Sequence, residues 1–279
     1  MAGRIKRKLG VFRCRYLHRY KYPVLFLSCC PKSASTWFGN LLARIVPGYH
    51  YDHPDEFRRP DGAGTNITDA VLRQLEGRYV VARSHTDASS ANLAVMDRAF
   101  GRYMFLARDP RDVAVSLYHH LHRYPRSSFI DTGASRQLPW RPLPSAVLQL
   151  EKPECIDVII DQLLPSLVGL TRRWLKASRD KDNVLVLTYE SITKSTADAV
   201  HRVLDFYGIS VSEKRIERTI HRLDRRRLEV GRWKFRKGDV GDWKTELEPY
   251  QQQAIEHLSG NVLTDLGYAV SRADKSSAA

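Results

Sequence analysis

Residues 24–45 read VLFLSCCPKSASTWFGNLLARI and join a short apolar run to an amphipathic one. The run Val24–Leu27 is apolar at every position, which predicts a buried strand of a parallel sheet. After a loop rich in serine and threonine, the apolar residues at 37, 41, 42 and 45 recur at helical spacing. Pro47 and Gly48 then end the pattern. The stretch therefore predicts a strand, a loop and a helix in direct succession.

Three further segments have the same apolar character: Tyr79–Ala82, Tyr103–Ala107 and Val184–Thr188. Helical patterns lie between them. Asp109 can cap a helix that begins at Pro110. Apolar residues also recur at helical spacing over Ile156–Lys176, where Pro165 predicts a kink. Alternating strands and helices predict an α/β fold of three layers, with a central, mostly parallel sheet flanked by helices.

The length of the chain suits one domain with one sizeable core, because it has 279 residues of which 43% are hydrophobic. We expect a basic amino-terminal extension over residues 1–22, the folded domain over residues 23–270 and a small, polar, frayed tail over residues 271–279. The extension is expected to be a solvated, disordered arm. Contact of this arm with an anionic membrane or a glycan is the alternative.

The formal net charge of +14 indicates an anionic ligand, but it does not separate nucleic acid, lipid and phosphorylated small molecules. The longest apolar runs, Tyr22–Cys30 and Ile156–Leu164, fall short of the roughly 18 to 20 residues of a membrane-spanning helix. No apolar stretch of signal-peptide length follows the basic amino terminus, so we expect a cytoplasmic protein. The four cysteines lack the spacing of metal ligands, which predicts reduced thiols and no metal site.

Charged, hydroxyl and aromatic side chains follow the predicted strands. Ligands of open parallel sheets bind beyond the carboxyl ends of the strands. The first strand leads into Pro31–Trp37, the second into Arg83 and His85, the third into Arg108 and the fourth into Tyr189. The first of these loops has the chemistry of a phosphate cradle: N–H groups at a helix start, hydroxyls and a lysine. The order of a Walker A loop is absent, because the lysine precedes the hydroxyls.

Three segments resemble motifs of the cytosolic-type sulfotransferases, which transfer a sulfuryl group from 3′-phosphoadenosine 5′-phosphosulfate (PAPS) and release 3′-phosphoadenosine 5′-phosphate (PAP). Pro31–Trp37, PKSASTW, resembles the P-K-S-G-T-T-W phosphosulfate loop of that family. Arg108–Ser116, RDPRDVAVS, resembles its 3′-phosphate motif. Arg236–Lys244, RKGDVGDWK, matches R-K-G-x-x-G-D-W-K at every specified position. The resemblance implies a PAPS-dependent enzyme with a P-loop nucleotide-kinase-like fold.

The resemblance also implies roles for individual residues in binding the donor. The residues around the 5′-phosphosulfate would be Lys32, Ser33, Ala34, Ser35 and Thr36. The adenine would stack on Trp37 and lie near Tyr189. The 3′-phosphate would be held by Arg108, Ser116, Arg236, Lys237 and the amide of Gly238, and Thr219 would be a further nucleotide contact.

The catalytic residues implied by the resemblance follow the second predicted strand and the first. His85 matches the histidine of the family's K-x-H motif, and Arg83 stands where a lysine is usual. Neutral His85 would take the proton of the acceptor as the acceptor attacks sulfur in line. Lys32 would stabilise the charge that grows on the departing phosphate oxygen. This chemistry requires no metal ion.

The sequence departs from the family pattern at several positions. Ala34 stands in place of a glycine and Ser35 in place of a threonine, so the loop must accommodate a methyl group, which predicts weaker donor binding. The family's dimer motif, K-x-x-x-T-V-x-x-x-E, is degraded: Lys244 is followed by Glu248, Pro249 and Gln253 at the other specified positions. We therefore expect a monomer or a dimer of another kind.

The acceptor is expected to be a small molecule, a lipid or a glycan, bound between variable loops. These loops are His50–Pro60, Thr86–Asn92 and Tyr124–Trp140. Their aromatic residues favour an apolar slot, whereas the arginines nearby favour an anionic acceptor. The sequence leaves both open.

Two other functions compete with sulfuryl transfer. A nucleotide kinase would share the phosphate loop between strand and helix, but it would need magnesium and ATP, and the Walker order is missing. A basic protein that binds nucleic acid or anionic lipid by charge alone would leave the segment Arg236–Lys244 without a purpose. We therefore expect no nucleic-acid partner.

Overall fold

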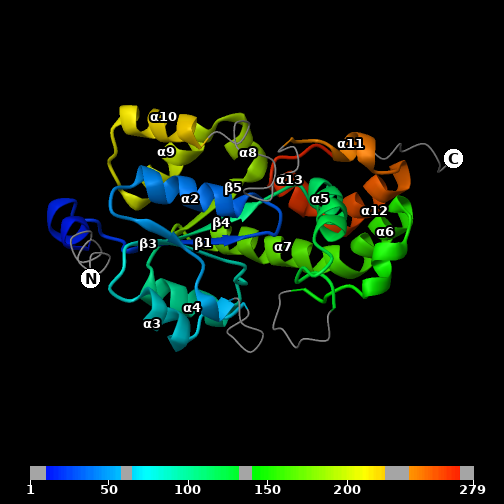
Figure 1. The fold of residues 1–279 in the computed structure, drawn as a ribbon, viewed down its shortest axis with the longest axis horizontal. Coiled ribbons are helices and arrows are strands. Elements are labelled where there is room, and N and C mark those ends of the chain that lie inside the picture. The colour runs from blue at the N-terminus through cyan, green and yellow to red at the C-terminus, as the bar shows by residue number, and fades with distance from the viewer. Residues whose placement is uncertain (1–10, 58–64, 132–139, 224–238, 271–279) are drawn as a thin grey trace.

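The protein is built on one parallel sheet with the strand order β2-β3-β1-β4-β5. A computed structural model describes residues 11–57, 65–131, 140–223 and 239–270 (Figure 1). The strands are β1 (Val24–Cys29), β2 (His50–Asp52), β3 (Val80–Ser84), β4 (Tyr103–Ala107) and β5 (Val184–Thr188). The four strands predicted from apolar runs are confirmed, and so is the α/β class.

The fifth strand, β2, is missing from the sequence-based prediction, which placed its residues in an acceptor loop over His50–Pro60. It has only three residues, and two of them are histidine and aspartate. Its position is defined by its pairing with β3, where His50 lies opposite Val80 and Asp52 opposite Ala82. An edge strand this short and polar contains no apolar run, so only the neighbouring strand makes it recognisable.

The alternating side chains of β1 divide the core into two halves, one on each face of the sheet. Val24 and Phe26 belong to the larger half, and Leu25 and Leu27 belong to the other. The larger half is completed by α3 (Asp69–Leu75), α4 (Ser90–Ala99), α5 (Pro110–Arg123) and α7 (Leu164–Asp180). The other half is completed by α2 (Ser35–Ile45), α8 (Tyr189–Lys194), α9 (Thr196–Tyr207) and α10 (Glu213–Arg222). The three predicted layers are therefore present (Figure 1).

Shorter elements surround this frame. They are η1 (Arg13–Leu17), η2 (Asp55–Phe57), η3 (Ser145–Gln149), α6 (Lys152–Val158), η4 (Ile159–Leu163), α11 (Trp243–Glu246), α12 (Pro249–Ser259) and α13 (Asn261–Asp265). In the loop between α5 and α6, which includes the predicted acceptor loop Tyr124–Trp140, Ile130 pairs with Leu143 and η3 follows. The loop is thus partly ordered by its own contacts.

The helix predicted over Ile156–Lys176 is uninterrupted along the chain but changes its winding. The π-helical turn η4 lies between α6 and α7, and Pro165 stands in the first turn of α7. A proline lacks an N–H group, and its ring crowds the carbonyl group four residues before it. The wider π turn accommodates this crowding where the sequence predicts a kink.

Residues 11–22 differ from the disordered arm expected from the sequence. Cys14 of η1 is fully buried, and its thiol donates a hydrogen bond to the Pro47 carbonyl at 3.6 Å. The ring of Tyr20 lies 5.3 Å from that of Tyr49 and 6.3 Å from that of Tyr79. This part of the extension is therefore packed on the domain through Cys14 and Tyr20, whose partners no local pattern shows.

Among the described residues, no helix has both the length and the apolar character needed to cross a membrane. All four cysteines are free and buried, in agreement with the expected reduced thiols.

Trp174 is the largest side chain that is fully buried, and its substitution tests the core. It stacks on Phe105 at 5.3 Å, and its indole N–H donates to the Thr86 carbonyl at 3.0 Å. We expect Trp174→Ala to lower the free energy of unfolding by about 3–5 kcal/mol in urea titrations, because it leaves a large cavity. Trp174→Phe keeps most of the apolar contact, and the Thr86 carbonyl still accepts from the Ser28 hydroxyl. An equal cost for both variants would contradict this account.

Candidate active site

The loop between β1 and α2 has an unusual backbone. Lys32 and Ala34 are both in the left-handed region, with φ values of 68° and 59°. Alternation of this kind curls a chain so that successive N–H groups converge into an anion-binding concavity, here directly before the amino terminus of α2. The Ser33 hydroxyl is turned inward and donates to the Cys30 carbonyl at 2.6 Å, which fixes the curl. The structure thus has a curled loop where the sequence predicts a phosphate cradle.

Trp37, predicted to stack on the adenine, lies in the first turns of α2. Its side chain is 2% exposed, and its indole N–H donates to the Leu223 carbonyl at 2.7 Å. Leu223 is the last described residue before the gap at 224–238. Trp37 therefore ties α2 to the carboxyl end of α10.

His85 lies beside the cradle, at the carboxyl end of β3. Its Nδ1 is 2.8 Å from the Cys29 carbonyl oxygen, which must accept, so Nδ1 carries the proton and Nε2 can act as an acceptor. Burial, with the Arg83 guanidinium beside it, lowers the pKa of His85 to about 3, against the opposing effect of the Cys29 carbonyl. The imidazole is consequently neutral over the whole physiological range of pH.

Arg83 joins His85 to the hydroxyl groups of the cradle. One guanidinium nitrogen lies 3.2 Å from His85 Nε2 and donates to Ser35 Oγ at 3.4 Å. The other lies 3.3 Å from Nδ1 of His53. A single cation therefore contacts a predicted catalytic residue and a predicted binding residue. His53 is a further residue of this cluster that the sequence analysis did not predict, because it follows β2, a strand that was also not predicted.

A second imidazole lies close to the other catalytic candidate. Lys32 Nζ is 3.1 Å from Nδ1 of His120, on α5. His120 is one helical turn beyond Ser116, which is half-buried on the same helix. The sequence analysis missed His120; its spacing of four from Ser116 is the signal that could have found it, because residues i and i+4 share a helix face.

A row of rings connects the two imidazoles. The ring of His120 is 5.6 Å from that of Phe129, Phe129 stacks on Trp140 at 4.8 Å, and Trp140 meets His85 at 5.5 Å. Phe129 and Trp140 are each 5% exposed. Two aromatic residues of the predicted acceptor loop Tyr124–Trp140 thus reach the reaction centre, whereas Tyr49 packs with Tyr20 on the other half of the core.

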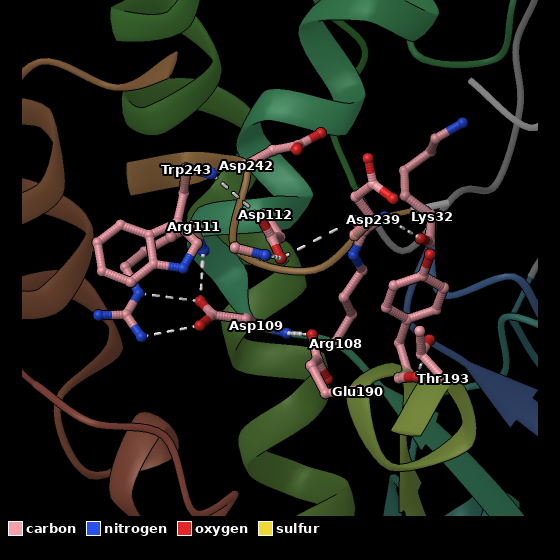
Figure 2. A network of polar contacts seen from close by, with 12 residues as sticks. Lys32, Arg108, Asp109, Arg111, Asp112, Glu190, Thr193, Asp239, Asp242 and Trp243 are labelled. Atoms are coloured by element: carbon pink, nitrogen blue, oxygen red, sulfur yellow. Dashed lines mark hydrogen bonds and ion pairs between the residues drawn. The ribbon is translucent and has the colours of Figure 1, made fainter. Parts of the chain in front are cut away.

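Arg108 lies at the meeting point of the other predicted motifs (Figure 2). It is 8% exposed and donates to the Lys32 carbonyl at 2.8 Å and to the Asp239 carbonyl at 3.5 Å. Its guanidinium carbon lies 4.2 Å from the centre of the Tyr189 ring. Three predicted strand ends therefore converge on one side chain.

Asp112 holds the last motif against α5. Its carboxylate accepts from the backbone N–H groups of Gly241 at 2.8 Å and Trp243 at 3.2 Å, as Figure 2 shows. Burial raises the pKa of Asp112, while Arg108 and the two N–H groups oppose that shift. The segment after residue 238 is thus attached to α5, which carries most of the predicted 3′-phosphate motif.

Further contacts support the same corner. Asp109 caps α5, as predicted, and also pairs with Arg111 at 2.8 Å. The Arg111 guanidinium lies 3.9 Å from the centre of the Trp243 ring and pairs with Glu256 at 2.8 Å. Glu190 accepts from the Asp109 N–H at 3.1 Å. These buried pairs keep the start of α5 in place.

The remaining predicted site residues make no contact with Lys32, His85 or Arg108 that the structure records, or lie outside the described residues. Thr219 is on α10, and its hydroxyl donates within that helix, to the Arg215 carbonyl at 2.7 Å. Thr36 is half-buried at the start of α2. Arg236, Lys237 and Gly238 lie outside the described residues. Within the described ranges, no group of three or more histidine, cysteine, aspartate or glutamate side chains could hold a metal ion.

A family model described as the sulfotransferase domain matches residues 23–267, and the chain belongs to that family. The predicted family and the predicted enzyme class are therefore confirmed.

Curated relatives are distant but extend over most of the chain. The chain is 24% identical to a 3-alpha-hydroxysteroid sulfotransferase of Cavia porcellus, over 82% of this chain and 79% of the relative. It is 20% identical to cytosolic sulfotransferase 13 of Arabidopsis thaliana, over 83% of this chain and 74% of the relative.

Solved structures agree with the fold. A mouse sulfotransferase complexed with PAP matches with a TM-score of 0.59 at 17% identity, over 86% of this chain and 83% of that one. A retinol dehydratase in complex with retinol and PAP matches with a TM-score of 0.58 at 18% identity, over 95% and 88%. These similarities show the shared P-loop-like architecture.

The left-handed backbone of Ala34 predicts that a glycine there stabilises the protein. An L-residue in this region costs about 1–2 kcal/mol, whereas glycine adopts it freely. After the loss of chain entropy, we expect Ala34→Gly to raise the free energy of unfolding by about 1 kcal/mol in urea titrations. Ala43→Gly, in the right-handed interior of α2, is the matched control and should lower it by about 1 kcal/mol. A destabilising Ala34→Gly would show that the methyl group, and not the backbone, determines this position.

Proposed function

We propose that the protein transfers a sulfuryl group from PAPS to the hydroxyl or amine of a small acceptor, with His85 as the general base. One observation carries most of the weight: Arg108 donates to the Lys32 carbonyl while Asp112 accepts from Gly241 and Trp243. Segments from three distant parts of the sequence thus meet at one edge of the sheet. An anionic donor with phosphates at both ends of an adenosine suits such a corner.

Buried polar atoms support an anion at this corner. The Nε groups of Arg83 and Arg108 are buried and have no hydrogen-bond partner among the described residues. Buried N–H groups of this kind are rare in folded proteins unless a ligand or water accepts from them. Arg108 would hold the 3′-phosphate together with Ser116, Arg236, Lys237 and Gly238. The curled loop from Lys32 to Thr36 would hold the 5′-phosphosulfate.

The reaction follows from the positions of the side chains. The acceptor oxygen forms a bond to sulfur, and the bond between sulfur and the bridging phosphate oxygen breaks, which releases PAP. Nε2 of His85 receives the acceptor proton, because Nδ1 already carries one. Lys32 stabilises the negative charge left on the phosphate. Burial and the Arg83 guanidinium lower the pKa of His85, so the imidazole is neutral before the acceptor binds.

The acceptor is proposed to be a small molecule with an apolar body. Phe129 and Trp140 lie next to His85, so an apolar group bound for reaction would contact aromatic rings. Similar proteins are named for a hydroxysteroid and for retinol, both of which join an apolar skeleton to a hydroxyl. The cytoplasmic location, the domain boundaries and the absence of the usual family dimer stay predictions.

A nucleotide comparison tests donor binding. We expect PAP to raise the melting temperature more than 5′-AMP does, because only PAP has a 3′-phosphate. Arg108→Ala should weaken PAP binding by about tenfold or more, as a charge-assisted contact is lost, and should abolish the difference between the two nucleotides. Arg98→Ala, on the exposed side of α4, is the matched control. Equal responses of the unsubstituted protein to PAP and 5′-AMP would overturn a dedicated 3′-phosphate site.

Turnover with labelled PAPS tests the base. We expect His85→Ala to lower kcat by about 10²- to 10⁴-fold, the usual contribution of a general base. Its thermal response to PAP should persist, since His85 is not placed in donor binding. His122→Ala, an exposed histidine on α5, should turn over normally. Unchanged turnover of His85→Ala would remove the base assignment, and turnover of ATP with magnesium would favour a kinase instead.

A further inference from the structure

The surface of η1 carries an unusual concentration of exposed apolar side chains. Phe12 is 56% exposed, Tyr16 56% and Leu17 66%. Seven large apolar side chains are exposed among the described residues, and three of them lie between positions 12 and 17. The other four are scattered over distant parts of the sequence, so the amino-terminal group is the one that forms a local cluster. Clustered exposed apolar groups mark interaction sites more often than isolated ones do.

These side chains are exposed although the segment that carries them is packed on the domain. Cys14, between Phe12 and Tyr16, is fully buried and bonded to the Pro47 carbonyl. Tyr20 packs on Tyr49 and Tyr79 just after the cluster. The helical turn is therefore anchored on one side by Cys14 and Tyr20. The apolar side chains on its other side are held toward the solvent.

The same segment is strongly basic. Arg13, Arg15, Arg19 and Lys21 are all exposed beside the apolar cluster. Residues 1–21 contain eight lysines and arginines in total, and no acidic residue precedes Asp52. Anionic groups of a partner would thus meet no negatively charged side chain in this part of the sequence.

We propose that Phe12, Tyr16 and Leu17, with Arg13, Arg15 and Arg19, form a docking patch for anionic lipid membranes. An interface of anionic lipids offers both things that the patch requires: headgroups for the guanidinium groups and an apolar phase for phenylalanine and leucine. Tyrosine is favoured at the depth between the two. A nucleic acid would satisfy the arginines but would leave Leu17 without an apolar partner. This proposal goes beyond sulfuryl transfer and does not depend on it.

The position of the docking patch leaves the candidate active site accessible. Tyr49 and Tyr79, on which Tyr20 packs, come just before β2 and β3, at the amino ends of the strands. Lys32, His85 and Arg108 follow the carboxyl ends of their strands. In Figure 1, η1 projects from the end of the molecule opposite to α11 and α12. A membrane bound at the docking patch would therefore recruit the protein without covering the donor site.

Sedimentation of the full chain with lipid vesicles tests the proposal. We expect binding to vesicles of phosphatidylcholine with phosphatidylserine, and little binding to phosphatidylcholine alone. The variant Phe12→Ser/Tyr16→Ser/Leu17→Ser should lose about tenfold or more in partitioning, because the apolar anchors are removed. Arg13→Glu/Arg15→Glu/Arg19→Glu should lose about as much, because each charge near an anionic surface contributes to binding.

Two matched variants control for exposure and charge elsewhere. Leu150→Ser/Tyr250→Ser removes exposed apolar side chains outside the docking patch, and Arg98→Glu/Lys194→Glu reverses exposed charges on α4 and α8. Both should partition like the unsubstituted protein. All four variants should keep the thermal response to PAP, which separates this proposal from that of the enzymatic function.

Several outcomes would overturn the docking patch. Absence of vesicle binding by the unsubstituted protein is one, and binding that is equal with and without phosphatidylserine is another. Full partitioning of the variant at Phe12, Tyr16 and Leu17 would show that charge alone suffices. Tighter binding to an RNA oligonucleotide that displaces the vesicles would assign the basic segment to nucleic acid.

Discussion

The structure depends on a buried carboxylate that joins parts of the chain more than a hundred residues apart. Asp112 accepts from the N–H groups of Gly241 and Trp243, and Arg108, two residues before α5 begins, donates to the Lys32 carbonyl. Such charge-assisted bonds in a buried corner are stronger than neutral ones. They set the distance between the curled loop after β1 and the segment that follows residue 238.

This corner is organised for binding at some expense of stability. Lys32 and Ala34 hold left-handed conformations, which residues other than glycine usually avoid. The Nε groups of Arg83 and Arg108 are buried without a hydrogen-bond partner among the described residues. Strain and unpaired polar groups of this kind gather at functional sites, where the rest of the fold must support them. Here the support comes from the two apolar cores and from the pairs of Arg111 with Asp109 and Glu256.

The two residues proposed for catalysis lie at opposite ends of a row of aromatic rings. His85 is half-buried between the Cys29 carbonyl and the Arg83 guanidinium, which fixes its tautomer and keeps it neutral. Lys32 lies beside His120, on the other side of the row formed by Phe129 and Trp140. In the proposed reaction, aromatic rings thus separate the residue that receives the proton from the lysine that stabilises the leaving phosphate.

The sequence by itself determined the features that depend on local pattern. Apolar runs located β1, β3, β4 and β5, and the order PKSASTW located the cradle, because burial and backbone curl follow from neighbouring residues. It also identified His85 and Arg108 as strand-end residues. Only the tertiary structure decided what meets across the sequence: the edge strand β2, the contact of Lys32 with His120, the tautomer of His85, and the packing of Cys14 and Tyr20 on the domain. These features depend on which surfaces meet when the helices pack on the sheet. The periodicity of apolar residues along the chain does not determine those contacts.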